Sequence, residues 1–255
     1  MNKIREEFIV KFKNLIENCE FIYTAWEGGS AATGYLDEYS DLDLAIICDD
    51  DKIETAFELI ENYLQKNYGV KRKFRMPEPN WHGHSQCFYQ LEKPSEFLYA
   101  DILIEKLSAG NRFMEKDRHG NAIVWFDKKA LFDPTPTSQE AVDEKCERLY
   151  KMTADSIWVL VIEAKKQILR GNLVDAAVTY NQLLNRMAPL FNLQFRKSKV
   201  DFGLRYAERD FPQETVDWLI DKLYVKDLAD MQKKFKQVED KIYELIEELK
   251  DKWFE

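Results

Sequence analysis

The sequence predicts an α+β protein, in which a mixed sheet flanked by helices is followed by an all-α region. In the first half of the chain, short apolar runs that alternate as in strands are mixed with segments of helical periodicity. In the second half, only long segments with the 3.6-residue period of a helix occur. The segment Asp133 to Pro136, Asp-Pro-Thr-Pro, separates the two patterns. At 255 residues the chain is long enough for two small domains. We therefore expect one domain at 1–137 and a second at 138–255.

The first domain is predicted to contain both helices and strands. Apolar residues at helical spacing predict helices at 3–18 and 52–68, and the acidic run Asp49 to Asp51 is expected to cap the second. A Glu-Lys-Pro-Ser turn is expected to join two strands, 85–91 and 97–104, into a hairpin. The other predicted strands lie at 21–27, 41–48, 70–75 and 122–126. The basic run within 70–75 is typical of a charged edge strand.

The second domain is predicted to be helical throughout. Its periodic segments predict helices at 138–170, 173–192, 213–223 and 227–252. The pair Arg170-Gly171 is a helix C-terminal signature.

Composition narrows the class of protein. The formal charge is −9, with the acidic excess before residue 137, which argues against broad nucleic-acid binding. The four cysteines are far apart and form no CxxC pair, so we expect free thiols that are buried or half-buried. No signal peptide and no apolar stretch of membrane-spanning length is visible. We expect a cytoplasmic protein without membrane contact.

The segment from Trp26 to Cys48 carries the main chemical signal; it reads WEGGSAATGYLDEYSDLDLAIIC. Asp41 and Asp43 are two apart on a predicted strand, so both side chains leave the same face. Two such carboxylates repel each other unless a cation lies between them. Gly29 and Ser30, at the start of a short predicted helix that Ser30 would cap, offer backbone N–H groups and a hydroxyl to a phosphate.

Asp101 is the third notable acid, because it lies in the middle of the apolar strand 97–104. A lone carboxylate there is costly unless a cation or a hydrogen-bond donor pairs with it. If it lies beside Asp41 and Asp43, the three would hold two divalent ions, Mg²⁺ above all. Two such ions clamp the attacking and leaving oxygens of an in-line displacement at phosphorus, and Asp101 would accept the proton of the attacking hydroxyl.

The segment 29–34 followed by 40–44 resembles the Gly-Ser…Asp-x-Asp signature of the DNA polymerase β nucleotidyltransferase superfamily. It is similar to the GSxAxG…SD(L/I)DL form of minimal nucleotidyltransferases and antibiotic adenylyltransferases. The resemblance implies that Asp41 and Asp43 bind both metal ions. It also implies that Asp101 binds one of them and that Gly29 and Ser30 bind the triphosphate.

The helical half is similar to the domain that follows the catalytic domain in aminoglycoside and lincosamide adenylyltransferases. That resemblance implies a second domain that binds substrate. The candidate contact residues share this half of the chain, and for each a solvated or core helix position is the simpler interpretation; they are Glu163, Lys165, Tyr180 and Arg186.

His82 and His84 have a spacing that zinc sites use, but no third ligand is nearby in sequence. A contact with base or substrate stays open, and exposed loop histidines are the simpler expectation. Four tryptophans offer stacking surfaces for a base and are expected mostly in the core; these are Trp26, Trp81, Trp125 and Trp158.

The function predicted from these features is transfer of AMP from ATP to a hydroxyl of a small molecule, with an aminoglycoside-type antibiotic as one candidate acceptor. The acidic charge suits a cationic acceptor. The alternative is a protein-modifying or antitoxin nucleotidyltransferase that acts with a partner protein. Partners of that kind carry an Arg-x4-His motif, and all three histidines here precede residue 138, so a fused partner is disfavoured. A catalytically inactive binding module is a third option, which the three acids disfavour. The nucleotide base, the acceptor and the oligomeric state stay open.

Overall fold

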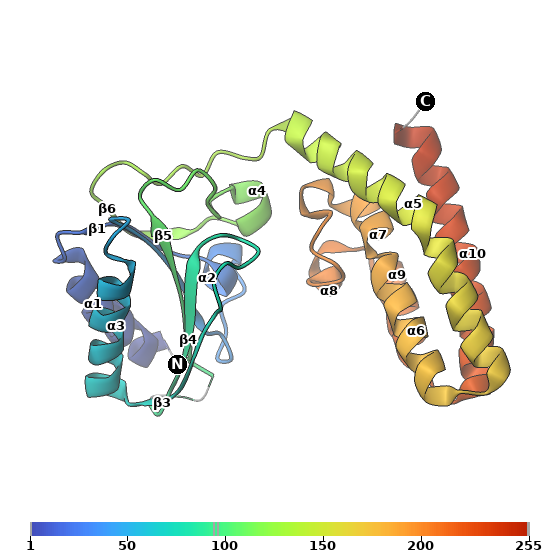
Figure 1. The fold of residues 1–255 in the computed structure, drawn as a ribbon, viewed down its shortest axis with the longest axis horizontal. Helices are drawn as coiled ribbons and strands as arrows, with labels where there is room; N and C mark the ends of the chain where they lie inside the picture. Colours follow the sequence, from blue (N-terminus) through green and yellow to red (C-terminus); the bar gives the residue numbers. More distant parts are fainter. Residues whose placement is uncertain (1, 94, 96, 254–255) are drawn as a thin grey trace. The chain divides into compact units, whose positions relative to one another are not determined.

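The computed structural model describes residues 2–93, 95 and 97–253 (Figure 1). The chain divides into two compact units, Met1–Pro136 and Thr137–Glu255. Within the described residues, none of the helices is both long enough and apolar enough to pass through a membrane.

The first unit is built on a mixed sheet, which in the described part of the chain has six strands in the order β3-β4-β5-β2-β1-β6. β2 and β5 pair in parallel and the remaining neighbours pair antiparallel. The basic strand β3 lies at the sheet edge, as its charge predicts. The strands are β1 (Ile22–Glu27), β2 (Leu42–Cys48), β3 (Val70–Arg75), β4 (Ser85–Leu91), β5 (Ala100–Lys106) and β6 (Ile123–Asp127).

Two helices, α1 (Asn2–Glu17) and α3 (Ile53–Tyr68), lie on one face of this sheet (Figure 1). Their apolar stripes, with Phe8, Phe12 and Ile60 among them, pack on alternate strand residues and form the larger core of the unit. The short helices α2 (Gly29–Thr33) and α4 (Lys116–His119) lie on the opposite side of the sheet (Figure 1).

That opposite face is only partly filled with apolar side chains. Trp26, Ala45, Ile47 and Met114 form a small buried cluster there. Because strand residues alternate between faces, Asp43 shares this face with Ala45 and Ile47. The sheet therefore presents its acids on the face that α1 and α3 do not cover.

The second unit is helical throughout. A long helix, α5 (Gln139–Arg170), begins at Ser138, whose hydroxyl accepts a hydrogen bond from the Ala141 N–H, and ends at Gly171 in the left-handed conformation. It packs with the other helices around a separate apolar core. Those helices are α6 (Leu173–Arg186), α7 (Ala188–Phe195), the 3-10 turn η1 (Lys197–Lys199), α8 (Ala207–Asp210), α9 (Gln213–Leu223) and α10 (Leu228–Trp253). The predicted α+β fold class is confirmed.

Several predicted elements were wrong in detail. β5 begins at Ala100 and not at residue 97. The helix predicted over 173–192 is two helices that meet at Met187, because Pro189 starts a new helix in its first turn. The antiparallel pair β4 and β5 is confirmed, but the connection between them is longer than the four-residue turn we expected.

The acidic run before α3 does not cap that helix. Lys52 occupies the capping position, and no side chain accepts a hydrogen bond from the first turn. Asp50 instead accepts hydrogen bonds from the backbone N–H and the hydroxyl of Ser108, and so ties the end of β2 to the end of β5. Two of the tryptophans expected in the core, Trp81 and Trp158, are exposed.

The cysteine prediction is confirmed for the residues that the structure describes. All four thiols are free; Cys19 is half-buried and the other three are buried. Burial, reinforced by the neighbouring charges of Asp49 and Asp50, raises the pKa of the Cys48 thiol to about 12. Such a thiol is not a nucleophile at neutral pH.

Candidate active site

The parallel pairing of β2 with β5 places two of the predicted acids side by side. Asp43 and Asp101 occupy directly paired positions on the two strands. Paired residues on neighbouring strands lie about 5 Å apart at the backbone and point to the same face. Asp41 lies one residue before β2, and its carbonyl oxygen accepts a hydrogen bond from Arg5 Nη2 at 3.1 Å.

The glycine turn, Gly28 and Gly29, packs directly against Asp43. The Gly28 N–H donates to the Asp43 carbonyl oxygen at 2.9 Å. Gly29 has a φ of +52°, and a Cβ added to it would lie 1.7 Å from Asp43 Oδ2. No side chain fits at position 29 without displacing that carboxylate, so glycine is required both for the backbone conformation and for the close approach.

Ser30 does not cap α2, contrary to expectation. Gly28 occupies the capping position and Ser30 lies inside the first turn of the helix. Among the described residues, the buried Ser30 Oγ has no hydrogen-bond partner. A buried hydroxyl without a partner is costly, so this oxygen is available to a ligand atom.

The electrostatics of Asp101 indicate a site for positive charge. Burial, and then the negative charge of Asp41, raise the pKa of Asp101 from its ordinary value of 3.8 to about 6. A hydrogen bond from Gln86 Nε2 to Asp101 Oδ1, at 2.7 Å, acts in the opposite direction. The carboxylate is thus held in place by a neutral donor.

Tyr99 interacts with all three acids. Its hydroxyl hydrogen-bonds to Asp41. Its pKa is raised first by burial, then by that hydrogen bond, and then by the charges of Asp41, Asp43 and Asp101. One hydroxyl therefore senses all three carboxylates, although Asp41 lies outside the paired strands.

Oxygen donors of this kind fit a divalent cation such as Mg²⁺. Asp43 and Asp101 supply two carboxylates on one face, and the pKa of Asp101 is raised first by burial and then by the charge of Asp41. As they stand, no three histidine, cysteine or acidic side chains in the described part of the chain are grouped closely enough to hold a metal ion. Asp43 and Asp101 nonetheless fit such an ion by the chemistry of their carboxylate oxygens and by their shared face of the sheet.

Gln86 and Tyr99 were missed by sequence reasoning. Gln86 belongs to the ordinary alternation of polar and apolar residues along β4, so it carries no signal of its own. Only the register of β4 against β5 places it beside Asp101. Tyr99 had a signal, since it lies two residues before Asp101, but a tyrosine in an apolar run is ordinarily read as a core residue.

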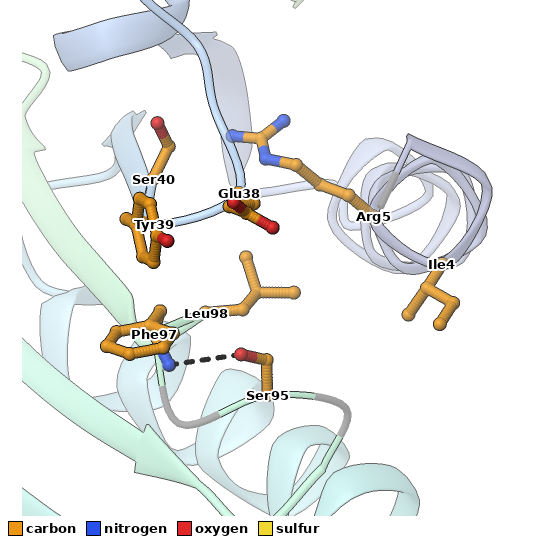
Figure 2. A pocket seen from close by; sticks show the side chains of 8 residues that line it. All are labelled: Ile4, Arg5, Glu38, Tyr39, Ser40, Ser95, Phe97 and Leu98. Atoms are coloured by element: carbon orange, nitrogen blue, oxygen red, sulfur yellow. Dashed lines mark hydrogen bonds between the residues drawn. The ribbon is translucent and has the colours of Figure 1, made fainter.

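A cavity of about 370 Å³ lies next to this site (Figure 2). Ile4 and Arg5 reach it from α1, and Phe97 and Leu98 reach it from the segment before β5 (Figure 2). Arg5 is buried and forms an ion pair with the equally buried Glu27. The same guanidinium bonds to the Asp41 carbonyl oxygen, so this wall of the cavity also positions the first acid.

The histidines differ from the expectation of exposed loop residues, whereas the helical candidates occupy the core or solvated positions that were the simpler interpretation. His82 and His84 are buried and not exposed, and the described residues place no zinc-binding set around them. Tyr180 is fully buried, and its hydroxyl donates to the Lys222 carbonyl oxygen, so it belongs to the helical core. Glu163 pairs with a lysine of its own helix. Lys165 is exposed and Arg186 is half-buried.

Comparison with known proteins finds a family that is similar to the first unit. The family described as nucleotidyltransferase domain matches residues 2–105. This match agrees with the resemblance to the DNA polymerase β superfamily and covers the residues that carry the sequence signature. The matched range contains the glycine turn and all three acids.

No curated protein matches the sequence. Among solved structures, an aminoglycoside 6-adenyltransferase from Bacillus subtilis is similar at 12% identity, over 96% of this chain and 89% of that chain, with a TM-score of 0.36. A likeness of that size does not extend the neighbour's substrate to this chain.

Proposed function

We propose that the chain is a metal-dependent adenylyltransferase, which moves AMP from ATP to a hydroxyl group of a small molecule and releases pyrophosphate. The observation that carries the proposal is the position of the Asp43 carboxylate. It pairs with Asp101 on one side and lies against Gly29 on the other. A turn suited to phosphate and acids suited to a cation thus meet at one carboxylate.

The chain's own residues supply binding and orientation. Gly29 leaves room for the triphosphate to approach, and the Ser30 hydroxyl, which otherwise lacks a partner, donates to a phosphate oxygen. Asp41, Asp43 and Asp101 would hold two Mg²⁺ ions, which would neutralise the phosphates and stabilise the attacking and leaving oxygens. Asp101 Oδ1 is held by Gln86, and the carboxylate accepts the proton of the acceptor hydroxyl.

In the proposed reaction, the acceptor oxygen forms a bond to the α-phosphorus of ATP as the bond from that phosphorus to the oxygen that bridges the α- and β-phosphates breaks. The proton of the acceptor passes to Asp101, and the electron pair of the broken bond leaves on pyrophosphate. No protein nucleophile takes part, so catalysis rests on positioning and charge neutralisation.

The acceptor class follows from charge. The net charge of −9, with its excess in the first unit, favours a cationic small molecule such as an aminoglycoside. We assign the helical region from residue 138 onward to acceptor binding. Exposed polar residues of α5, such as Lys165, are better candidates for that contact than Tyr180, which the helical core requires.

The test incubates the protein with Mg²⁺, each of ATP, GTP, CTP and UTP, and a panel of aminoglycosides and lincosamides, and follows pyrophosphate release. Acceptor-dependent release with ATP supports the proposal, and Asp43→Asn should abolish it while the protein stays folded. Normal turnover by folded Asp43→Asn protein would overturn the site. If no small molecule stimulates pyrophosphate release and a protein becomes labelled instead, the protein-modifying alternative is favoured.

A further inference from the structure

The loop before β4 buries two histidines beside the candidate site. His82 and His84 are 6% and 4% exposed. The loop is held by hydrogen bonds from Asn80 Nδ2 to the His84 carbonyl oxygen at 2.6 Å and from Asn111 Nδ2 to the His82 carbonyl oxygen at 3.0 Å. Phe113 packs edge-on against both rings. His82 thus has a defined place and a defined orientation.

The hydrogen bonds of His82 determine its tautomer. The His84 backbone N–H donates to His82 Nδ1 at 3.1 Å, so Nδ1 carries no proton. Burial lowers the pKa of the His82 imidazole, which keeps the ring neutral at pH 7. A neutral ring without a proton on Nδ1 has its proton on Nε2.

The same logic orients Gln86. His82 Nε2 lies 3.2 Å from Gln86 Oε1, and the N–H donates to that oxygen. The amide nitrogen of Gln86 is therefore turned toward Asp101 and donates to Oδ1 at 2.7 Å. The result is a directed chain from a backbone N–H through His82 and Gln86 to Asp101, in which every donor meets an acceptor.

We infer that Gln86 and His82 are positioning residues for nucleotidyl transfer, with His82 fixing the Gln86 amide and Gln86 fixing the Asp101 carboxylate. This inference rests on the proposed function. In this series of hydrogen bonds the neutral Gln86 amide occupies Asp101 Oδ1, so the other oxygen of Asp101 is left to bind the cation or to accept the proton. Without His82, the Gln86 amide is free to turn its oxygen toward the carboxylate, which repels it.

The first test does not depend on activity. In ¹⁵N-labelled protein at pH 7.5 without metal, the His82 resonances should show a proton on Nε2 in a hydrogen bond. Gln86→Leu should remove that hydrogen bond while the tautomer set by His84 remains. Gln90→Leu is the matched control, because Gln90 is the same residue type on the same face of β4, and it should leave the His82 spectrum unchanged. A proton on Nδ1 in the wild type overturns the chain.

The second test is a double-mutant cycle, read in Mn²⁺ affinity with a non-hydrolysable ATP analogue and in kcat with the acceptor found above. Gln86→Leu should weaken both by about 10–100-fold, the usual range for groups that orient metal ligands, with KM for ATP changed less than about threefold. His82→Leu should cost less, and the double variant should be no worse than Gln86→Leu alone. Gln90→Leu should match the wild type.

Additive losses in the cycle, or wild-type Mn²⁺ affinity in Gln86→Leu, would overturn the positioning role. Failure of the wild type to bind Mn²⁺ with the nucleotide analogue would instead overturn the proposed function. In that case the spectrum still decides whether the hydrogen-bonded chain exists.

Discussion

Asp101→Asn should inactivate the enzyme and yet stabilise it in the absence of metal. Burial and the charge of Asp41 raise the pKa of Asp101 from 3.8 to about 6 in the folded protein. The unfolded chain therefore loses this proton first as pH rises, and stability falls between about pH 4 and pH 6. A shift of roughly two units corresponds to about 3 kcal/mol of lost stability at pH 8. The neutral asparagine avoids that cost and its side-chain oxygen still accepts the Gln86 hydrogen bond.

The assay is urea unfolding of the wild type and of Asp101→Asn with EDTA, at pH 8 and at pH 4. The variant should be more stable by about 3 kcal/mol at pH 8, and the difference should nearly vanish at pH 4. Mg²⁺ with a non-hydrolysable ATP analogue at 100 times Kd should return about 2.7 kcal/mol to the wild type and much less to the variant. Asp51→Asn, at an exposed side chain, is the control and should change little.

A variant that is less stable than the wild type at pH 8 would refute this reasoning. So would a stability difference that is equal at both pH values, because the effect would then not come from the proton of Asp101. A gain from Mg²⁺ and nucleotide that is the same in both proteins would remove Asp101 from the metal site.

Three further outcomes follow from the same geometry. Gly29→Ala should abolish transfer, because the new methyl group would lie 1.7 Å from Asp43 Oδ2. Gly28→Ala should retain most activity in steady-state kinetics, because a Cβ at that position meets nothing within 4 Å. Arg5→Met should lower the free energy of unfolding by about 3–5 kcal/mol, since it leaves a buried carboxylate without its partner, and urea denaturation should show no such loss if that ion pair is unimportant. Tyr99→Phe should reduce kcat by roughly tenfold through loss of a hydrogen bond to a charged carboxylate, with unfolding free energy nearly unchanged; a kcat equal to the wild type would exclude Tyr99 from the site.

The elements that form the candidate site could be predicted from the sequence because their signals are local. A Gly-Gly-Ser break after a strand and an Asp-Leu-Asp start to the next can be seen without any knowledge of pairing. The acid inside the apolar strand that became β5 was found for the same reason. Helix ends marked by glycine, such as Gly171, were also predicted well.

The features that the sequence did not predict depend on contacts across the sheet. The contact between Gln86 and Asp101 needs the antiparallel register of β4 against β5, and no local pattern specifies it. His82 and His84 are buried because Phe113, about 30 residues later, packs over them. The break at Met187 was predictable, since a proline two residues later is typical of a helix start.

The proposed reaction breaks the bond between the α- and β-phosphates of ATP, at a site formed by Asp41, Asp43 and Asp101. The most direct measurement follows ATP labelled at the α-phosphorus or at the γ-phosphorus with the first acceptor that the panel yields. We expect the α-label to join the acceptor, the γ-label to leave in pyrophosphate in equal amount, and Asp43→Asn to stop both. Transfer of the γ-label to the acceptor, or release of orthophosphate in place of pyrophosphate, would exclude nucleotidyl transfer at this site.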